Sequence, residues 1–247
     1  MSIPPIRTAG FIFLSLLATA KAGPPLLTDD PDTPKLHEWE INIAAIGTKQ
    51  GSEWNLNTPL VDLNFGLFEN VQLKYEQPWL VGAGKGAPTG GIGDSLFGVK
   101  WRFIGNSEED WKVSAYPQFS MTDSLSSTRR GLVPGGWQMI LPLEVQKKFG
   151  STTLFEEVGY LINEYGGNGL LWGSAFEQEI TEKFSLLGEL HAISGTGFRN
   201  DNIVFNVGFH WKTTEHVALI GSAGRAIHEG GQNGPQCLTY LGVQLTF

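Results

Sequence analysis

The feature that most constrains this chain is a two-residue alternation of apolar and polar side chains. In the stretch 71–80, Val71, Leu73 and Tyr75 alternate with Gln72 and Lys74. This period is typical of a β-strand with one apolar face, whereas a helix would spread the same side chains around its axis. The pattern predicts strands in twelve segments: 37–47, 58–67, 71–80, 92–104, 111–120, 137–149, 153–162, 170–180, 184–193, 203–211, 217–225 and 238–247. Charged or small residues blur the alternation in the seventh and eleventh segments, which allows a β-bulge in either.

The last segment indicates what the apolar faces contact. Over residues 239–247, Leu241, Val243, Leu245 and Phe247 alternate with uncharged polar or small residues, as in a strand between lipid and a polar lumen. A terminal aromatic residue also resembles the C-terminal signal of bacterial outer-membrane proteins. No apolar run beyond residue 22 approaches the ~20 residues of a transmembrane helix. The 32 glycines, 15 phenylalanines and 8 tryptophans are typical of a membrane barrel.

The first 22 residues resemble a secretory signal peptide. Arg7 precedes an apolar run at 10–20, and Ala20, Lys21 and Ala22 form a small-x-small cleavage site. We expect cleavage before Gly23, which removes 2 of the 17 basic residues and none of the 25 acidic ones, so the mature net charge is 15 − 25 = −10. This balance argues against a nucleic-acid partner. A single cysteine, Cys237, cannot form an internal disulfide.

The connections and the aromatic residues predict how the strands cross the membrane. Connections 68–70, 149–152, 181–183 and 212–216 are short, whereas 81–91, 121–136, 163–169, 194–202 and 226–236 are longer and glycine-rich. Short periplasmic turns and long surface loops are typical of outer-membrane barrels. Aromatic residues would form two belts at the lipid headgroups: Trp39, Trp101, Trp111, Trp211, Phe149, Phe184 and Phe247 at the periplasmic end, and Trp79, Trp137, Trp172 and Phe119 at the other. A soluble β-sandwich would instead place its tryptophans in the middle of the core.

We therefore predict an all-β fold, a transmembrane antiparallel up-and-down β-barrel of about 12 strands, in the outer membrane of a Gram-negative bacterium. Residues 1–22 would be the signal peptide. Residues 23–36 would be an N-terminal periplasmic or lumen-facing segment, and residues 37–247 the barrel.

Several blocks of the sequence resemble a known family. They are residues 23–34 (GPPLLTDDPDTP), 39–42 (WEIN), 91–94 (GIGD) through 100–103 (KWRF), and 222–225 (SAGR). They resemble the outer-membrane proteins grouped as meta-pathway phenol degradation transporters. The resemblance implies an outer-membrane barrel that takes up small, often aromatic or hydrophobic compounds, and it supplies no catalytic motif.

The inward-facing residues predict a charged lumen about 10 Å wide or less. Basic residues lie on the third to fifth strands and acidic residues on the sixth, eighth and ninth: Lys74, Lys100, Arg102 and Lys112, against Glu144, Glu177, Glu179 and Glu189. These residues could form opposed walls that orient dipolar solutes. Local pairing, such as Glu76 beside Lys100, is the more common arrangement. Inward apolar or aromatic residues would narrow the channel: Leu96, Ile140, Leu187, Ile220, Tyr116 and Tyr240.

The acidic N-terminal segment has two interpretations. Asp29, Asp30 and Asp32 could enter the lumen as a plug that pairs with Lys100 and Arg102, or residues 28–34 could form a solvated turn before the first strand. The turn is our preferred expectation. Three carboxylates without a defined loop pattern are a weak signal for calcium, so we predict no metal site.

We expect no catalytic site and no cofactor. His191 and His210 face inward, but His210 should lie opposite about Ser185, which separates the two rings by ~20 Å. The outward Ser174 should pair with Leu190, whereas a lipid hydrolase would need a serine and a histidine together on the outer face.

These observations predict a channel for facilitated diffusion of small hydrophobic or aromatic compounds. Its partners would be outer-membrane lipids, the barrel assembly machinery and the solute. The alternatives are a closed structural or assembly barrel without transport and, less favoured, an outer-membrane lipid hydrolase.

Overall fold

The computed structural model describes residues 23–83, 89–107, 110–165, 167–197, 202–229 and 234–247, so the predicted signal peptide lies outside the described residues. These residues form β-strands and one short helix, α1 (Leu125–Arg129). The strands are β1 (Trp39–Gln50), β2 (Glu53–Phe68), β3 (Val71–Ala83), β4 (Thr89–Ile92), β5 (Ser95–Ile104), β6 (Lys112–Ala115), β7 (Gln118–Met121), β8 (Trp137–Phe149), β9 (Thr152–Asn163), β10 (Gly169–Thr181), β11 (Phe184–Gly195), β12 (Asn202–Lys212), β13 (Val217–Glu229) and β14 (Cys237–Thr246). In this part of the chain, no helix is long and apolar enough to cross a membrane.

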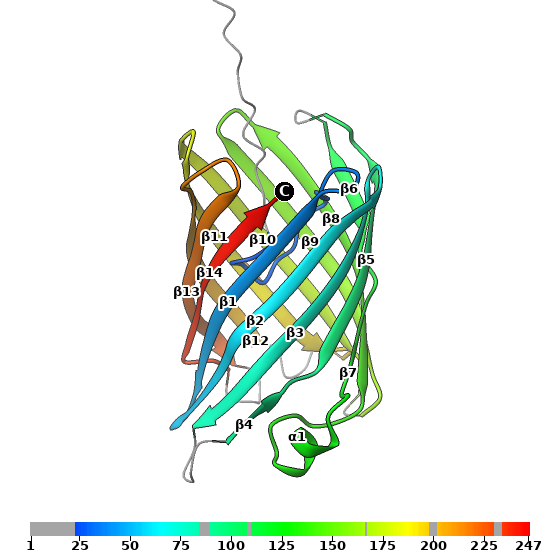
Figure 1. The fold of residues 1–247 in the computed structure, drawn as a ribbon, viewed down its shortest axis with the longest axis vertical. Coiled ribbons are helices and arrows are strands. Elements are labelled where there is room, and N and C mark those ends of the chain that lie inside the picture. Colours follow the sequence, from blue (N-terminus) through cyan, green and yellow to red (C-terminus); the bar gives the residue numbers. More distant parts are fainter. Residues whose placement is uncertain (1–22, 84–88, 108–109, 166, 198–201, 230–233) are drawn as a thin grey trace, which may run out of the picture.

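The strands form one antiparallel sheet that closes on itself (Figure 1). β1 pairs with β2 on one side and with β14 on the other. At this seam Trp39 N donates to Phe247 O at 2.7 Å, and Phe247 N donates to Trp39 O at 3.1 Å. β4 and β5 lie end to end beside β3, and β6 and β7 lie end to end beside β8. The sheet is therefore a barrel of 12 spanning strands, which confirms the predicted fold class.

Two spans are interrupted in the middle. The first interruption falls at Gly93 and Asp94, between β4 and β5, and the second at Tyr116 and Pro117, between β6 and β7. Pro117 has no N–H to donate to a ladder, but its carbonyl still accepts from Val99 N at 3.0 Å. The barrel wall therefore stays continuous across this break.

The sequence allowed a β-bulge in the seventh segment, but the strand register there is regular. β9 pairs with β8 and with β10 without a shift, so no bulge forms there. β13 pairs regularly with β12 from Ala218 to Ala226, and the register shifts beyond Ala226. This irregularity falls outside the predicted eleventh segment, toward the end of the barrel that carries the longer loops.

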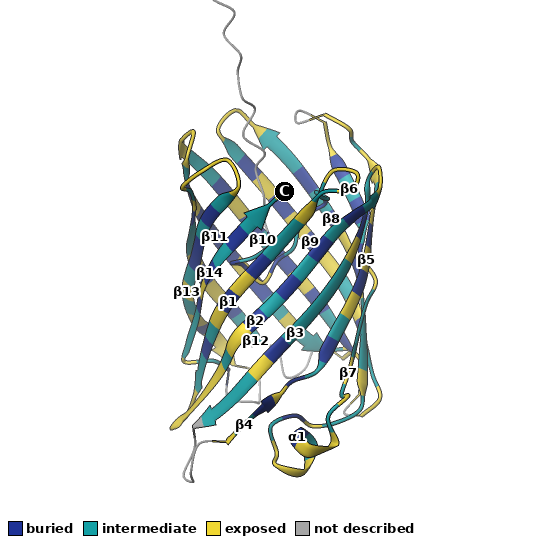
Figure 2. Cartoon of the chain, in the orientation of Figure 1, coloured by how far each residue is buried: buried dark blue, intermediate teal, exposed yellow. Residues whose placement is uncertain are grey.

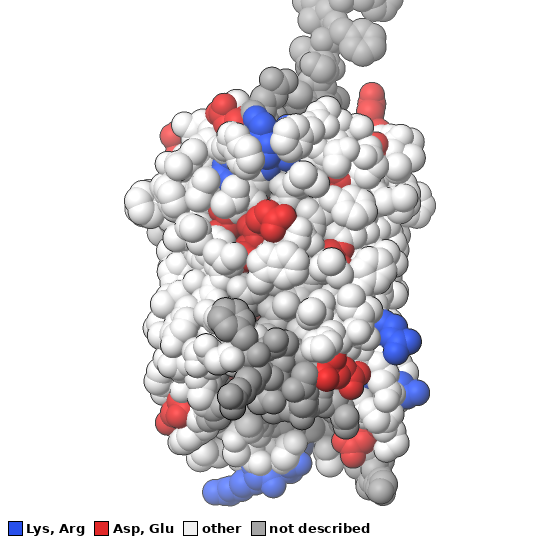
Figure 3. All heavy atoms as spheres, turned by 180° about the vertical axis from the view of Figure 1, so that it is seen from behind, with Lys and Arg blue, Asp and Glu red and all other residues white. Residues whose placement is uncertain are grey.

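Exposed and buried residues alternate along the strands, as Figure 2 shows. On β9, Leu154 and Val158 are exposed and face outward, whereas Thr153, Phe155 and Glu157 are buried and face inward. The tryptophans of the two predicted belts are all exposed: Trp39, Trp101, Trp111, Trp211, Trp79, Trp137 and Trp172. In the view of Figure 3, most of the visible outer wall between the two ends carries no Lys, Arg, Asp or Glu, apart from a few acidic side chains and some basic ones at the right edge. Such a wall suits contact with lipid.

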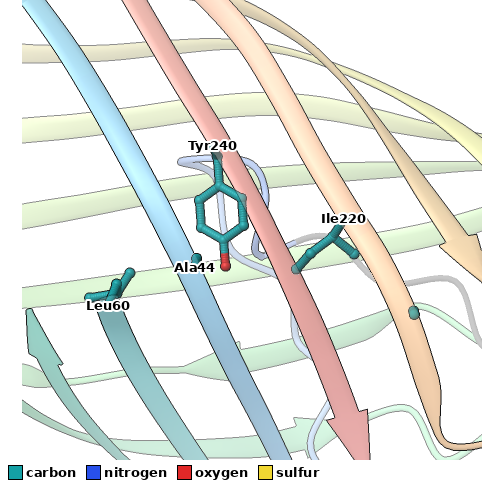
Figure 4. Packing of buried hydrophobic residues seen from close by; sticks show 5 residues of the cluster. Ala44, Leu60, Ile220 and Tyr240 are labelled. Atoms are coloured by element: carbon teal, nitrogen blue, oxygen red, sulfur yellow. The ribbon is translucent and has the colours of Figure 1, made fainter. Parts of the chain in front are cut away.

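The interior contains two small apolar clusters. One joins Leu26 of the N-terminal segment to Phe155, Ala175 and Leu187 of the wall. The other lies at the seam and joins β1, β2, β13 and β14; its members are Ala44, Leu60, Ala218, Ile220 and Tyr240 (Figure 4). The space inside the barrel therefore holds both the packed core and the candidate functional site.

Candidate functional site: the barrel lumen

The N-terminal segment, residues 23–36, runs inside the barrel as far as residue 34, and its last two residues are exposed. Thr28 is 0% exposed and Asp30 is 5% exposed, and their contacts come from strands on opposite sides of the lumen. The expectation of a solvated turn is therefore wrong, and the plug arrangement is the one observed. A polar segment can be buried when the surrounding walls offer it charged or hydrogen-bonding partners.

On one side the segment binds acidic residues through its backbone N–H groups. Leu27 N and Thr28 N donate to the Glu189 carboxylate at 2.9 and 2.8 Å. Asp29 N donates to Glu157 Oε2 at 3.2 Å. Glu189 also accepts from Asn206 Nδ2 at 2.6 Å. β9 and β11 thus hold the segment by charge-assisted hydrogen bonds to its main chain.

On the other side the segment binds basic residues through its carboxylates. Lys100 Nζ lies 2.8 Å from Asp29 Oδ1 and also donates to the Asp30 carbonyl. Asp32 Oδ1 accepts from Arg102 at 2.5 Å and from Lys112 at 2.8 Å. β5 and β6 therefore bind the carboxylate side chains of the segment, whereas β9 and β11 bind its main chain.

The segment thus contacts two walls of opposite charge at once: its carboxylates pair with the basic wall, and its backbone N–H groups donate to the acidic wall. Burial by itself would raise the pKa of Asp29, but the neighbouring Lys100 and Lys74 hold the pKa of that carboxyl below its usual range. Burial raises the pKa of Asp30 well above its usual range despite the opposing effect of Lys100, and its neighbours Asp32 and Asp29 add to the rise. Of the two carboxyls, that of Asp29 is therefore the more readily ionised, and it lies opposite Lys100.

Shape complementarity also fixes the segment. Leu26 packs on Phe155, Ala175 and Leu187. A Cβ added to Gly173 would lie only 2.5 Å from Thr28 Oγ1, a distance at which one of the two must move. Glycine at this inward position of β10 therefore leaves the room that Thr28 occupies.

The predicted permeation residues lie in the lumen, but one predicted pair is wrong. Glu76 lies opposite Leu96 rather than beside Lys100, because the interruption between β4 and β5 and the connection after β3 set a register that strand periodicity does not reveal. Glu76 instead lies 3.4 Å from Lys74 Nζ, and Lys74 also lies 3.0 Å from Asp62.

The remaining predicted residues support the idea of local pairing. Glu144 Oε2 lies 3.6 Å from Lys100 Nζ and accepts from Ser114 Oγ at 2.5 Å. Lys100 Nζ also lies 4.5 Å from the centre of the buried Tyr116 ring. Glu177 is buried on the inward face of β10, and Tyr240 belongs to the seam cluster.

Two important lumen acids were missed by the sequence analysis. Asp62 pairs with Lys74 and accepts from Asn42 Nδ2 and Asn64 Nδ2, both at 3.2 Å. Glu157 contacts the N-terminal segment. Both lie on inward positions of their strands. The alternation could have identified Asp62 as a lumen residue, whereas the adjacent acids Glu156 and Glu157 blur it in the seventh segment.

Apolar inward residues are concentrated in the long-loop half of the strands, although polar ones such as Gln138 and His191 also lie there. On β2, Leu60 lies nearer the long-loop end than Asp62 and Asn64, and on β8, Ile140 and Pro142 lie nearer that end than Glu144. The inward residues of the long-loop half include Ile46, Leu60, Pro78, Leu80, Ile140, Pro142, Leu161, Leu171, Val204 and Ala226, all buried or half-buried. The short-turn half is charged, apart from a few apolar positions such as Ile220 and Leu187.

Little space remains where the segment crosses the lumen. A cavity of about 30 Å³ lies between the segment and the wall, next to Asp30, Asp62, Lys74, Lys100 and Tyr116. This volume holds ordered water but not a ring compound. The segment therefore fills most of the space between these residues.

The outer face does not bring a serine and a histidine together among the residues described. Ser174 lies opposite Leu190, as predicted, and its Oγ donates to Glu156 Oε1 at 2.6 Å. His210 lies opposite Ser185, also as predicted. Ser174 thus has a carboxylate partner but no neighbouring base of the kind that a serine hydrolase uses.

Comparisons with known proteins come from structure rather than sequence. No family model and no curated protein matches the chain, so the resemblance to the meta-pathway family stays a hypothesis. The COG4313 outer-membrane channel from Pseudomonas putida F1 is similar over 88% of this chain and 98% of that chain, with a TM-score of 0.73 and 14% identity. The NanC porin is similar over 83% of this chain and 98% of that chain, with a TM-score of 0.59 and 8% identity. The KdgM porin in complex with disordered oligogalacturonate is similar over 84% of this chain and 99% of that chain, with a TM-score of 0.58 and 13% identity. The chain therefore has the closed antiparallel barrel fold of outer-membrane channels and porins.

Proposed function

We propose that this protein is an outer-membrane channel for facilitated diffusion of small hydrophobic or aromatic compounds. The observation that carries the proposal is the mainly apolar inner wall of the long-loop half, which lies next to the charged half that the N-terminal segment crosses. An apolar solute that enters this half exchanges water for apolar contacts, which is favourable by about 25 cal/mol per Å² buried. A sugar or an ion gains nothing there and loses hydration.

The orientation and location follow the same proposal. The long-loop end would face the cell surface, and both ends of the mature chain would lie on the periplasmic side after cleavage of the signal peptide before Gly23. The exposed aromatic side chain of Phe247, next to the seam, would contact lipid and the barrel assembly machinery.

Uptake by intact Gram-negative cells tests the proposal. Cells that produce the protein should take up a neutral phenol faster than cells that lack it, and a sugar of similar mass should show a smaller difference. Ile140→Asn should slow phenol uptake roughly fivefold, because it removes about 1 kcal/mol of apolar contact. Gln138→Asn changes an inward residue of the same strand that is already polar, so it should leave uptake unchanged.

Equal uptake of phenol with and without the protein would refute the channel. That outcome would favour the second candidate, a closed barrel without transport. This candidate is supported by the ion pairs that hold the N-terminal segment across the lumen and by the small cavity beside it.

A further inference from the structure

The loop at 122–136, which joins β7 to β8, folds back onto the wall of the barrel. Its helix α1 contacts β4, and the two lie close together at the long-loop end in Figure 1. The Arg130 guanidinium donates to the Gly90 carbonyl of β4. The loop is therefore attached to the strand on which it rests.

Leu132 of this loop lies on the inner side of the wall. A Cβ added to Gly91 would lie 3.0 Å from Leu132 Cδ1, and one added to Gly82 would lie 3.7 Å from Leu132 Cδ2. Leu80 pairs with Gly91 and shares their face, whereas Trp79 beside it is exposed on the outer face. Two inward glycines therefore form the surface on which the Leu132 side chain rests.

The loop is held in this position by its own hydrogen bonds. Thr122 Oγ1 donates to Asp94 Oδ1, and Ser95 Oγ donates to Asp123 Oδ2, both at 2.5 Å. Leu132 N donates to Ser127 O at 3.0 Å. Val133 is buried, whereas Leu125 of the same loop is 75% exposed. Only part of the loop therefore faces the lumen.

We propose that loop 122–136 is the size-selecting gate of the channel and that Leu132 is its specificity-determining residue. The proposal rests on the function proposed above and assigns the first selection step to the cell-surface mouth, away from the ion-paired N-terminal segment. An apolar side chain over the entrance to an apolar wall admits small apolar solutes and restricts wide ones. Shortening the side chain widens the entrance.

The position of the gate can be tested without transport. In a Cys237→Ser background, Leu80→Cys places a thiol on the inner wall beside the two glycines that carry Leu132. The rate at which a membrane-impermeant maleimide labels this thiol in intact cells reports whether the loop covers it. Leu132→Ala should raise the labelling rate several-fold, and the exposed-face control Leu125→Ala should not.

A second pair of variants moves the loop without changing it. A Cβ at Gly91 would lie 2.5 Å from the Arg130 guanidinium and 2.8 Å from Ser127 Oγ, so Gly91→Ala should displace the loop and also raise labelling. Gly197→Ala is the control, because nothing lies within 4 Å of a Cβ at that position. Heat-modifiable mobility on gels verifies that each variant is folded.

Selectivity is then measured as the ratio of uptake rates for a two-ring naphthol and a one-ring phenol. The proposal expects this ratio to rise several-fold in Leu132→Ala and Gly91→Ala and to stay constant in both controls. Unchanged labelling, or raised labelling with an unchanged ratio, would overturn the gate while leaving the channel intact. If neither the wild type nor any variant takes up either solute, the proposed function itself fails and the gate fails with it.

Discussion

At the residue scale, the lumen is organised around Lys100. Its side chain is 3% exposed and contacts Asp29, Glu144 and the Asp30 carbonyl. The sequence identified Lys100 as a lumen residue, because side chains on alternate positions of a strand share a face, and it offered Asp29 as its partner only in the less favoured plug arrangement. It did not settle their contact, because the two residues lie 71 positions apart in the chain and no local pattern links them.

Replacing Lys100 by glutamate should release the N-terminal segment. Breaking a buried ion pair costs roughly 3–5 kcal/mol, and here the new carboxylate would face Asp29 and Glu144. We expect faster protease cleavage within residues 23–36 and a lower folded fraction on gels. Lys35→Glu is the matched control, because the Lys35 side chain on the same segment is 83% exposed and exposed pairs are worth about 1 kcal/mol or less. Equal protease resistance of the two variants would show that Lys100 does not hold the segment.

At the scale of elements, each of the twelve predicted strands corresponds to one observed span of the barrel. The prediction succeeded because each span has a long period-two pattern and is bounded by turn residues. Two registers were also predicted correctly: Ser174 opposite Leu190, across the short turn 181–183, and His210 near Ser185, across the longer loop 194–202. The pairing of Glu76 was not. It depends on a long connection and on the break at Gly93 and Asp94, and neither affects the hydrophobic period.

The seam between β1 and β14 provides a test at this scale. Deleting Phe247 removes both backbone hydrogen bonds to Trp39 and one exposed aromatic ring. We expect a clearly lower yield of folded barrel in outer-membrane fractions than for Phe247→Trp, which keeps the hydrogen bonds and an aromatic side chain. Deletion of Gly197 in a surface loop should be tolerated. If the Phe247 deletion assembles as well as the Gly197 deletion, the terminal residue has no part in closure or targeting.

At the scale of the whole molecule, the barrel and its N-terminal segment are separable parts. The strand ladder is continuous around the wall without the segment, but the segment has no hydrogen-bond network of its own beyond a few turns. Strand periodicity predicts the wall. It does not predict the path of a segment that lacks a period and takes its conformation from the wall.

Replacing residues 24–34 by a glycine–serine linker of equal length should therefore leave a folded barrel with a larger single-channel conductance in planar bilayers. The lumen charges would then contact water instead of the segment, which the polar lumens of outer-membrane barrels tolerate. Heat-modifiable mobility verifies folding, and the Lys35→Glu variant provides the reference conductance. An unchanged conductance in a folded variant would place the main constriction elsewhere.

The route of the segment also constrains the order of assembly. β1 follows the segment directly, and its pairing with β14 joins residues about 200 positions apart, a contact of high sequence separation that forms slowly. The segment binds β5, β6, β9 and β11, all of which lie between β1 and β14 in the chain. A chain whose segment docks on the open sheet would pair the basic residues early and bring β1 back toward β14. The same residues that close the finished pore would then act as a template for the circularisation of the sheet.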